Sequence, residues 1–382
     1  MIEAGALALT LWFGLGTLRA AEAARWWLAG FELVVLAMAA AMLARRKFAL
    51  RFHPLGLVLA GITLWGLAQA ALGISVDPHK TLLGALGWAV DCAAFSVALA
   101  ACGGARARRW FVTSQAVVAL GLGVVCIAWL YMAGELGPFA YKNQFAAYLE
   151  VGTGIAMARA IHDQKRRVAW IAAAGAMFAC AAAAGSRAGA ILCLAELIAL
   201  PAVAAWRGWI SRGTLARIAA LAVASAAALV MVTGWETVWQ RLQEPNPYAV
   251  RAEMLKSSVA MARERPVEGF GLGAWPSAFP GYALYDDGTF VNEAHNDWAQ
   301  WMVEGGAPLL LAMLAVVALL LKPAAASLWG LGLIAVFVHA WVDYPFEQRP
   351  ALAAFFWAMA GALAAEATAS ARSYRPDESC RA

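Results

Sequence analysis

Two residues of one polar stretch, Arg251 and His295, are the strongest candidates for chemistry in this sequence. The stretch runs from Trp235 to Trp298 and separates two long apolar segments. His295 stands in Asn-Glu-Ala-His-Asn-Asp, with a carboxylate residue on either side. A histidine is the usual proton acceptor for a hydroxyl nucleophile, and neighbouring carboxylates can hold its ring in one orientation. The competing interpretation is an exposed loop histidine.

Two arginines could hold an anion. Arg251 falls on an expected helix, 247–264, that ends before a proline. Arg187 follows Ser186, which is expected to cap a second helix. A helix N-terminus favours anions, so a guanidinium beside one is explained by a phosphate that accepts paired hydrogen bonds from it. Each arginine could instead contact a lipid headgroup.

The elements that must position these residues are membrane helices. The chain has 382 residues, of which 63% are hydrophobic and 14% charged, whereas soluble domains are about 25% charged. This composition predicts an all-α polytopic membrane protein. The net charge of +5 does not by itself indicate nucleic-acid binding, because the same excess of basic residues can lie in the loops of a membrane protein.

About 20 mostly apolar residues suffice for a membrane-spanning helix. On that basis twelve spans are expected, at 4–20, 26–44, 55–73, 82–103, 110–133, 143–161, 168–184, 187–204, 215–234, 299–321, 325–342 and 350–366. Gly185 and Ser186 interrupt the apolar run at 168–204, which predicts a tight helical hairpin.

Lys and Arg in the loops predict the orientation. Alternate loops and the C-terminal tail hold seventeen of them and the opposite short loops six. Because cytoplasmic loops carry the excess, both termini are expected in the cytoplasm. We therefore expect one integral membrane domain, 1–382, with a large external loop at 235–298, periplasmic in a Gram-negative cell, and a cytoplasmic tail at 367–382.

Under this topology four polar clusters meet on the outer side. They are Tyr141-Lys142-Asn143, Ser186-Arg187, the external loop with His295 and Asn296, and Asp343-Tyr344-Pro345-Phe346. Any one could be incidental, and their coincidence on one face is the informative observation.

Three other sequence patterns are weaker evidence for a functional site. Gly269-Phe-Gly-Leu-Gly has no strand before it, so a nucleotide-binding loop is rejected. No His, Cys and carboxylate set has the spacing of a metal site. Acidic residues in or near the spans, Glu32, Asp91, Glu150 and Glu196, would suit an ion route but form no repeated pattern.

The ordered motifs from Tyr141 to Ala353 resemble the O-antigen ligase family, which shares a Wzy-type C-terminal domain with O-antigen polymerases. The motifs are Lys142-Asn143, Ser186-Arg187-Ala188-Gly189, Arg251, Pro266-x-x-Gly-x-Gly-x-Gly, Ala294-His295-Asn296, Gly305-Gly306 and Val342-Asp343-Tyr344-Pro345-Phe346. The first five spans match only in hydropathy.

The resemblance implies a GT-C-like glycosyltransferase of the bacterial inner membrane that needs neither metal nor cofactor. It would move a glycan, with inversion, from undecaprenyl pyrophosphate to a hydroxyl of the lipid A-core. By this resemblance Arg187, Arg251 and Lys142 would bind pyrophosphate, and His295 would act on the hydroxyl. Tyr141, Asn143, Ser186, Asn296 and Asp343 would support them.

Two alternatives stay open. A Wzy-type polymerase would use the same motifs with a growing glycan as acceptor. A polytopic transporter or flippase would carry no chemistry, and it predicts inverted repeats and polar residues near mid-membrane.

Overall fold

The fold is a bundle of membrane-type helices. A computed structural model describes residues 2–18, 25–44, 53–233, 249–284, 290–347 and 350–373, with single positions at 239, 243 and 288. In these ranges the bundle has twelve helices: α1 (Ile2–Leu18), α2 (Arg25–Ala44), α3 (Pro54–Ala71), α4 (Pro78–Ala101), α5 (Ala105–Ala133), α6 (Lys142–His162), α7 (Arg167–Ala183), α8 (Arg187–Trp206), α9 (Arg212–Thr233), α13 (Asp297–Ser327), α14 (Gly330–His339) and α15 (Pro350–Ser373). Each overlaps one expected span, and no strand occurs in the described ranges, which confirms an all-α polytopic fold.

Eight of these helices are long and apolar enough to cross a membrane: α2, α3, α4, α5, α7, α8, α13 and α15. The other four differ in length or surroundings. Helix α1 contributes a shorter apolar stretch, Ala8–Leu18, and α6 carries Glu150 in its buried centre. The chain is therefore a multi-pass membrane protein in which some helices depend on their neighbours rather than on lipid.

The eleventh expected span, 325–342, is wrong in extent. Helix α13 continues to Ser327, and the chain then turns through Leu328, whose φ is +62°. Helix α14 has only 10 residues, about 15 Å at the usual rise, or half of the hydrocarbon core. Apolar composition alone did not reveal this turn, because both sides of it are equally hydrophobic. The shorter helix leaves residues 340–347 to form a loop between α14 and α15.

The core is organised by two buried helices. Helix α6 packs against α5, α7, α8 and α14, and α15 packs against α4. Small residues let the backbones approach: a Cβ added at Gly189 of α8 would lie 2.2 Å from the Cβ of Ala146 in α6. Close contact through small residues is a common basis of helix association in membranes. This approach places the start of α8 beside the start of α6.

The predicted hairpin between α7 and α8 is confirmed. Gly185 has a φ of +78°, a conformation that suits glycine. The Ser186 hydroxyl accepts a hydrogen bond from the backbone N–H of Gly189 at 3.3 Å and so caps α8. The turn puts Arg187 in the first turn of α8, at the same end of the bundle as Lys142.

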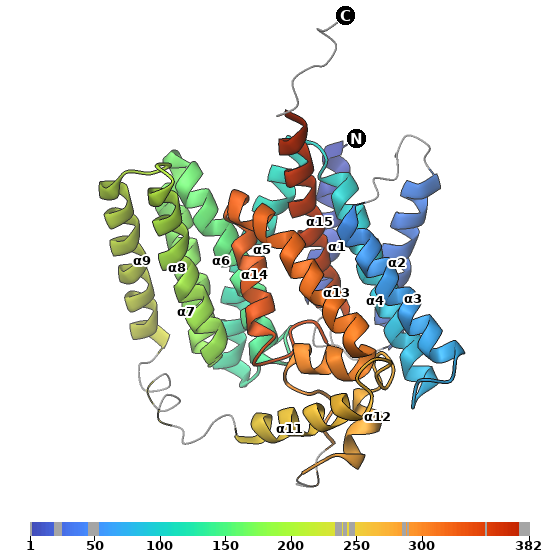
Figure 1. Ribbon diagram of the computed structural model, residues 1–382. Coiled ribbons are helices and arrows are strands. Elements are labelled where there is room, and N and C mark those ends of the chain that lie inside the picture. The colour runs from blue at the N-terminus through green and yellow to red at the C-terminus, as the bar shows by residue number, and fades with distance from the viewer. Residues whose placement is uncertain are drawn as a thin grey trace, which may run out of the picture.

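The described part of the segment between α9 and α13 forms a small helical cap across one end of the bundle (Figure 1). It contains α11 (Ala249–Glu264), α12 (Trp275–Ala278) and the short 3-10 helix η2 (Phe279–Gly281). This confirms the expected helix near 247–264. A separate apolar cluster, including Met261, Phe270 and Trp275, holds the cap together. Trp235 and the acidic pair Asp286 and Asp287 lie outside the described residues.

The glycines after α11 serve backbone contact rather than nucleotide binding. The N–H groups of Phe270 and Gly271 donate to the carbonyls of Val303 and Glu304 in α13. Helix α13 is interrupted at Gly306, where φ is +64° and ψ is −164°. A Cβ at Gly306 would lie 2.1 Å from the carbonyl oxygen of Val267. The loop therefore docks into the break in α13 and fixes α11 relative to the bundle.

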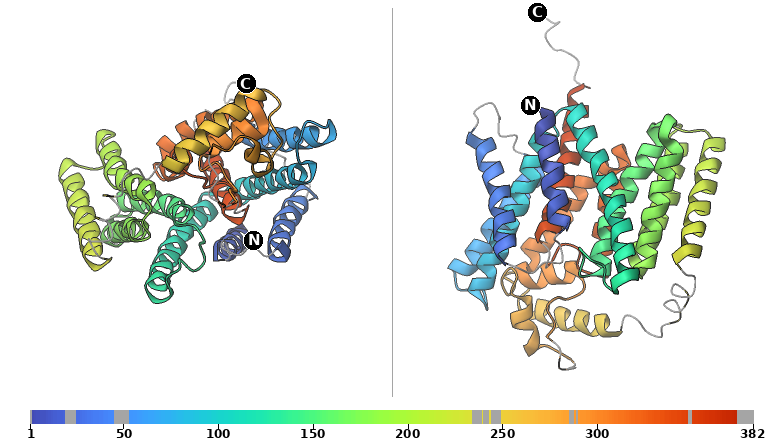
Figure 2. Two further views of the ribbon diagram at one scale, coloured as in Figure 1. Left: turned by 90° about the horizontal axis from the view of Figure 1, so that it is seen from below. Right: turned by 180° about the vertical axis from the view of Figure 1, so that it is seen from behind.

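The two ends of the bundle are distinct (Figures 1 and 2). Helix α1 begins and α15 ends at one end, whereas α11 and α12 lie at the other. This arrangement fits an even number of crossings; which end faces the cytoplasm stays a prediction from the charge pattern. Helix α15 continues to Ser373, into the expected tail, and residues 374–382 lie outside the described part.

We expect Gly306→Ala to destabilise the protein. Alanine would add strain at a positive φ, worth about 1–3 kcal/mol, and its Cβ would meet the Val267 carbonyl oxygen. The thermal unfolding temperature of the purified protein measures the effect. Gly61→Ala is the control, because its Cβ would have open space within a regular helix. Equal unfolding temperatures for both variants would contradict this role of Gly306.

Candidate functional site

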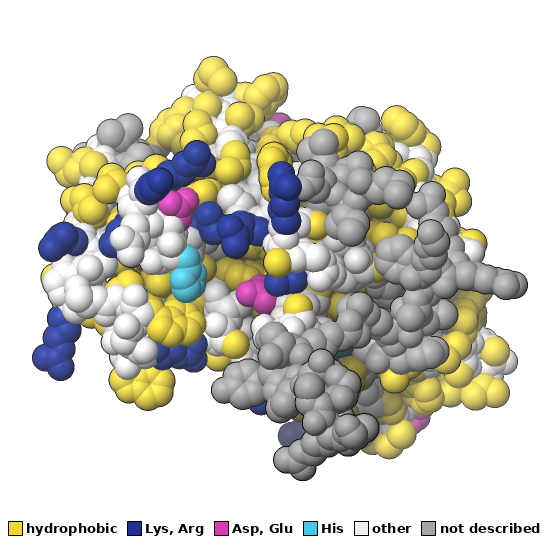
Figure 3. Space-filling model, turned by 90° about the horizontal axis from the view of Figure 1, so that it is seen from above, with side chains coloured by type: hydrophobic (Ala, Val, Ile, Leu, Met, Phe, Trp, Pro, Cys, Tyr) yellow, Lys and Arg dark blue, Asp and Glu magenta, His cyan; other side chains and the backbone are white. Residues whose placement is uncertain are grey.

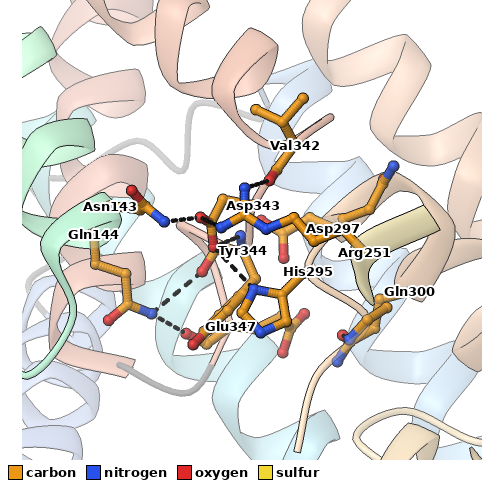
Figure 4. A network of polar contacts seen from close by, with 12 residues as sticks. Asn143, Gln144, Arg251, His295, Asp297, Gln300, Val342, Asp343, Tyr344 and Glu347 are labelled. Atoms are coloured by element: carbon orange, nitrogen blue, oxygen red, sulfur yellow. Dashed lines mark hydrogen bonds and ion pairs between the residues drawn. The ribbon is translucent and has the colours of Figure 1, made fainter. Parts of the chain in front are cut away.

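A buried carboxylate, that of Asp343, is the centre of the polar network at the capped end (Figure 4). Its side chain is 2% exposed. It belongs to the loop between α14 and α15, where it accepts a hydrogen bond from the backbone N–H of Tyr344 at 2.9 Å. Residues from three other parts of the chain converge on it.

Arg251 approaches Asp343 from the cap. Its Nη2 donates to Asp343 Oδ2 at 2.9 Å, and its Nη1 donates to the carbonyl oxygen of Val342 at 2.8 Å. The Arg251 side chain remains 27% exposed. A guanidinium has five N–H donors in a planar fork, and these two contacts fix its orientation.

His295 approaches from the segment before α13. Its Nδ1 lies 3.6 Å from Asp343 Oδ1, and its ring meets that of Tyr344 edge-on at 4.6 Å between centroids. His295 has a φ of +52°, an uncommon conformation for a non-glycine residue. The next residue, Asn296, caps α13 by accepting from Ala299 N–H at 3.0 Å, and it donates to the Trp341 carbonyl oxygen at 2.8 Å. The Asn296 side chain thus connects the loop that carries Asp343 with the turn that carries the His295 imidazole.

The third group comes from the start of α6. The Asn143 amide donates to Asp343 Oδ2, and Tyr141 packs edge-on against Tyr344 with 5.4 Å between ring centroids. Lys142 is the first residue of α6. Among the residues proposed from sequence, Asn143, Arg251 and His295 therefore share Asp343 as a partner. Arg187 and Ser186 stand at the same end, held there by the contact between Gly189 and Ala146.

The electrostatics of the site follow from this geometry. Burial acts to raise the pKa of Asp343, but the His295 imidazole and the Arg251 guanidinium outweigh it and hold that pKa below its ordinary value. Burial and the neighbouring Tyr141 raise the pKa of Tyr344, which therefore stays a neutral phenol. The site thus combines one stable carboxylate with cationic and neutral hydrogen-bonding groups.

Sequence reasoning missed a second layer of amides and carboxylates. Gln144 donates to the carbonyl oxygens of Tyr344 and Glu347 at 3.2 and 3.1 Å. Gln300 donates to Glu293 at 2.5 Å and to Glu304 at 3.2 Å. The helical spacing of Gln300 and Glu304 was visible in the sequence, but only the fold shows that they support the segment before His295.

One acidic residue considered for an ion route has a partner. Glu150 lies 2.6 Å from Nδ1 of His339, and both side chains are fully buried. His339 ends α14, and its carbonyl oxygen accepts from the backbone N–H of Asp343 at 3.1 Å. This pair therefore joins α6 to the base of the Asp343 loop.

Comparison with known families identifies the central part of the chain. Residues 172–314 match the family model described as O-antigen ligase, Wzy_C. This part of the chain is similar to the O-antigen ligase family. The matched region includes Arg187, Arg251 and His295, whereas Asn143 and Asp343 lie on either side of it. The match confirms the resemblance found in the sequence and supports the broad group of membrane ligases and polymerases. No curated protein matches the chain.

We expect Asp343→Asn to destabilise the protein in a pH-dependent way. The pKa of Asp343 is depressed in the fold, so its contribution is present above its ordinary value of 3.8 and is lost as the pH falls through the folded-state value. At pH 7 the loss is about 3–5 kcal/mol, as for breaking a buried ion pair.

Unfolding temperatures of wild type and variant between pH 7 and pH 3 measure this. The difference is expected to shrink as the pH falls below about 4, because the Asp343 carboxyl then takes up a proton in the unfolded chain while the folded protein keeps it ionised. Glu253→Gln is the control, because Glu253 pairs with Lys256 at the exposed surface of α11. A difference for Asp343→Asn that is the same at both pH values would contradict the prediction.

Proposed function

We propose that this protein is an O-antigen ligase-type glycosyltransferase of the bacterial inner membrane. It moves a glycan from undecaprenyl pyrophosphate to a hydroxyl of the lipid A-core at the periplasmic face. The main observation in support of this proposal is that one buried carboxylate, that of Asp343, contacts both Arg251 and His295. His295, a potential base, and Arg251, a potential anion-binding cation, are distant in sequence but thereby share one site at one end of the bundle.

In this proposal His295 is the general base. A proton on Nδ1, the nitrogen that faces Asp343, leaves the lone pair of Nε2 free to take the acceptor proton. The carboxylate then stabilises the imidazolium that forms, as the aspartate of a catalytic triad does. The acceptor oxygen attacks the anomeric carbon as its proton passes to Nε2.

The leaving group needs positive charge. The bond between the anomeric carbon and the pyrophosphate oxygen breaks as the new glycosidic bond forms, and its electron pair stays on the pyrophosphate. Arg251, Arg187 and Lys142 are proposed to bind this charge, because fixed cations at developing negative charge give large rate effects. Attack from the side opposite the leaving group inverts the anomeric centre.

Ligase and polymerase differ in the acceptor rather than in this chemistry. The purified protein in lipid, given a lipid-linked glycan together with lipid A-core, tests which one it is. Lipid A-core that gains the mass of the glycan supports the ligase. Lengthened lipid-linked glycan would show a polymerase. Unchanged substrates with correctly folded wild-type protein would contradict both.

We expect His295→Ala and Arg251→Ala each to abolish detectable glycan transfer. Loss of a general base costs roughly 10²–10⁴ in rate, and loss of Arg251 removes a cation at the leaving group. The measurement is the lipopolysaccharide gel profile of a deletion strain that carries each variant. Membrane insertion should be unchanged, because neither residue lies in one of the helices long and apolar enough to cross a membrane.

The matched control is Arg263→Ala. Arg263 lies on α11, as Arg251 does, but its side chain is exposed. This variant should keep the wild-type banding. Full banding with His295→Ala and with Arg251→Ala would refute the proposed roles.

A further inference from the structure

A cavity opens at the end of the bundle opposite the proposed active site. Its volume is about 960 Å³, and it lies between the start of α5, the end of α6, the segment that leads into α7, the turn between α13 and α14, and Glu366 of α15. The view onto this end shows basic side chains around a hollow, with histidine and acidic side chains among them (Figure 3). Nothing in the proposed transfer reaction uses this cavity.

Four cationic side chains line the cavity: Arg108, Arg109, Arg159 and Lys165. The two carboxylates in its wall, Asp163 and Glu366, form ion pairs with two of them. Arg159 Nη2 lies 3.4 Å from Asp163, and Arg108 Nε lies 3.9 Å from Glu366. Within the described ranges, neither Arg109 nor Lys165 forms an ion pair. The cavity therefore holds more positive than negative charge.

One buried donor in this wall has no hydrogen-bond partner. Arg159 Nε is inaccessible to solvent and is unpaired among the described residues. Its guanidinium lies over the ring of Trp170, 5.9 Å from the centroid, so its position is fixed. A buried donor without a partner costs about 1–3 kcal/mol, more when it is charged.

The deeper wall suits an apolar stem. Val112, Ile155 and Ala158 line the cavity together with the cations. Trp209 and Trp329 also border it, and tryptophan is typical of the membrane interface. Basic pockets between helices on the cytoplasmic side of a membrane can bind phospholipid headgroups. The combination of cations with apolar lining fits a phosphate diester attached to acyl chains better than a free ion.

We propose that this cavity binds the phosphate headgroup of an anionic membrane phospholipid. The site is on the opposite face from Asp343, so the proposal is independent of the transfer chemistry. Arg109 and Lys165 would attract the headgroup, and Arg159 would donate to a phosphate oxygen. A bound lipid would join α5, α6 and the start of α7 at this end.

The test compares lipid binding by the full-length protein with and without two of these charges. Native mass spectrometry after reconstitution in phosphatidylcholine nanodiscs containing dioleoyl-phosphatidylglycerol measures the retained anionic lipid. The double variant Arg109→Gln and Lys165→Gln should bind phosphatidylglycerol roughly thirtyfold more weakly, since each of the two cations near the surface contributes on the order of 1 kcal/mol. Its unfolding temperature in phosphatidylcholine alone should equal that of wild type, which shows that it folds.

The control double variant is Arg166→Gln and Lys322→Gln. It removes the same charge from side chains that do not line the cavity. Unchanged binding by the control supports the proposal, and an equal loss in both variants would overturn it by showing general attraction. Inorganic phosphate provides the other arm: if it displaces the lipid at millimolar concentration, a soluble phosphate is the ligand and the lipid assignment fails. Glycan transfer by the cavity variant reports separately on the proposed active site.

Discussion

The buried carboxylate of Asp343 is the constraint on which the functional end depends. A charge removed from water costs several kcal/mol unless it is paired and hydrogen-bonded. Asp343 meets that requirement through Arg251, Asn143 and the backbone N–H of Tyr344, with His295 at ion-pair distance. These partners come from the cap, from α6 and from the segment before α13. Satisfying one carboxylate therefore assembles groups that the chain keeps far apart.

The surrounding fold makes that assembly possible through close backbone contacts. The break at Gly306 accepts the loop after α11, and this docking sets the position of Arg251. The small residues Gly189 and Ala146 bring α8 against α6, which places Arg187 near the start of α6. Position in the site is thus set by residues that carry no charge. Substitutions at these glycines would displace functional side chains without removing any of them.

Much of this architecture could be predicted from the sequence, for reasons that differ between its parts. Long apolar runs separated by basic loops revealed the helices, and Gly185 followed by Ser186 revealed the hairpin. The length of α14 could not be predicted, because the turn at Leu328 interrupts a run that is apolar on both sides. Hydropathy reports burial and does not report where a buried backbone changes direction.

The candidate residues were easier to predict than their arrangement. Arg251 and His295 stood out because charged groups are rare in this chain. Asp343 was expected only as a supporting residue, because its central position arises from contacts with residues about 50 to 200 positions away. Gln144 and Gln300 were missed because buried amides have no distinctive spacing. Their roles depend on tertiary packing, which cannot be predicted from the sequence pattern around each residue.

The most direct measurement of the central claim is a double-mutant cycle between Arg251 and Asp343. Unfolding of wild type, Arg251→Gln, Asp343→Asn and the double variant would be followed at pH 7. If the carboxylate holds the guanidinium in place, the double variant should lose little more stability than the more damaged single variant, with a coupling of roughly 1–3 kcal/mol. Losses that add within about 0.5 kcal/mol would contradict the claim, because separated residues behave in that way.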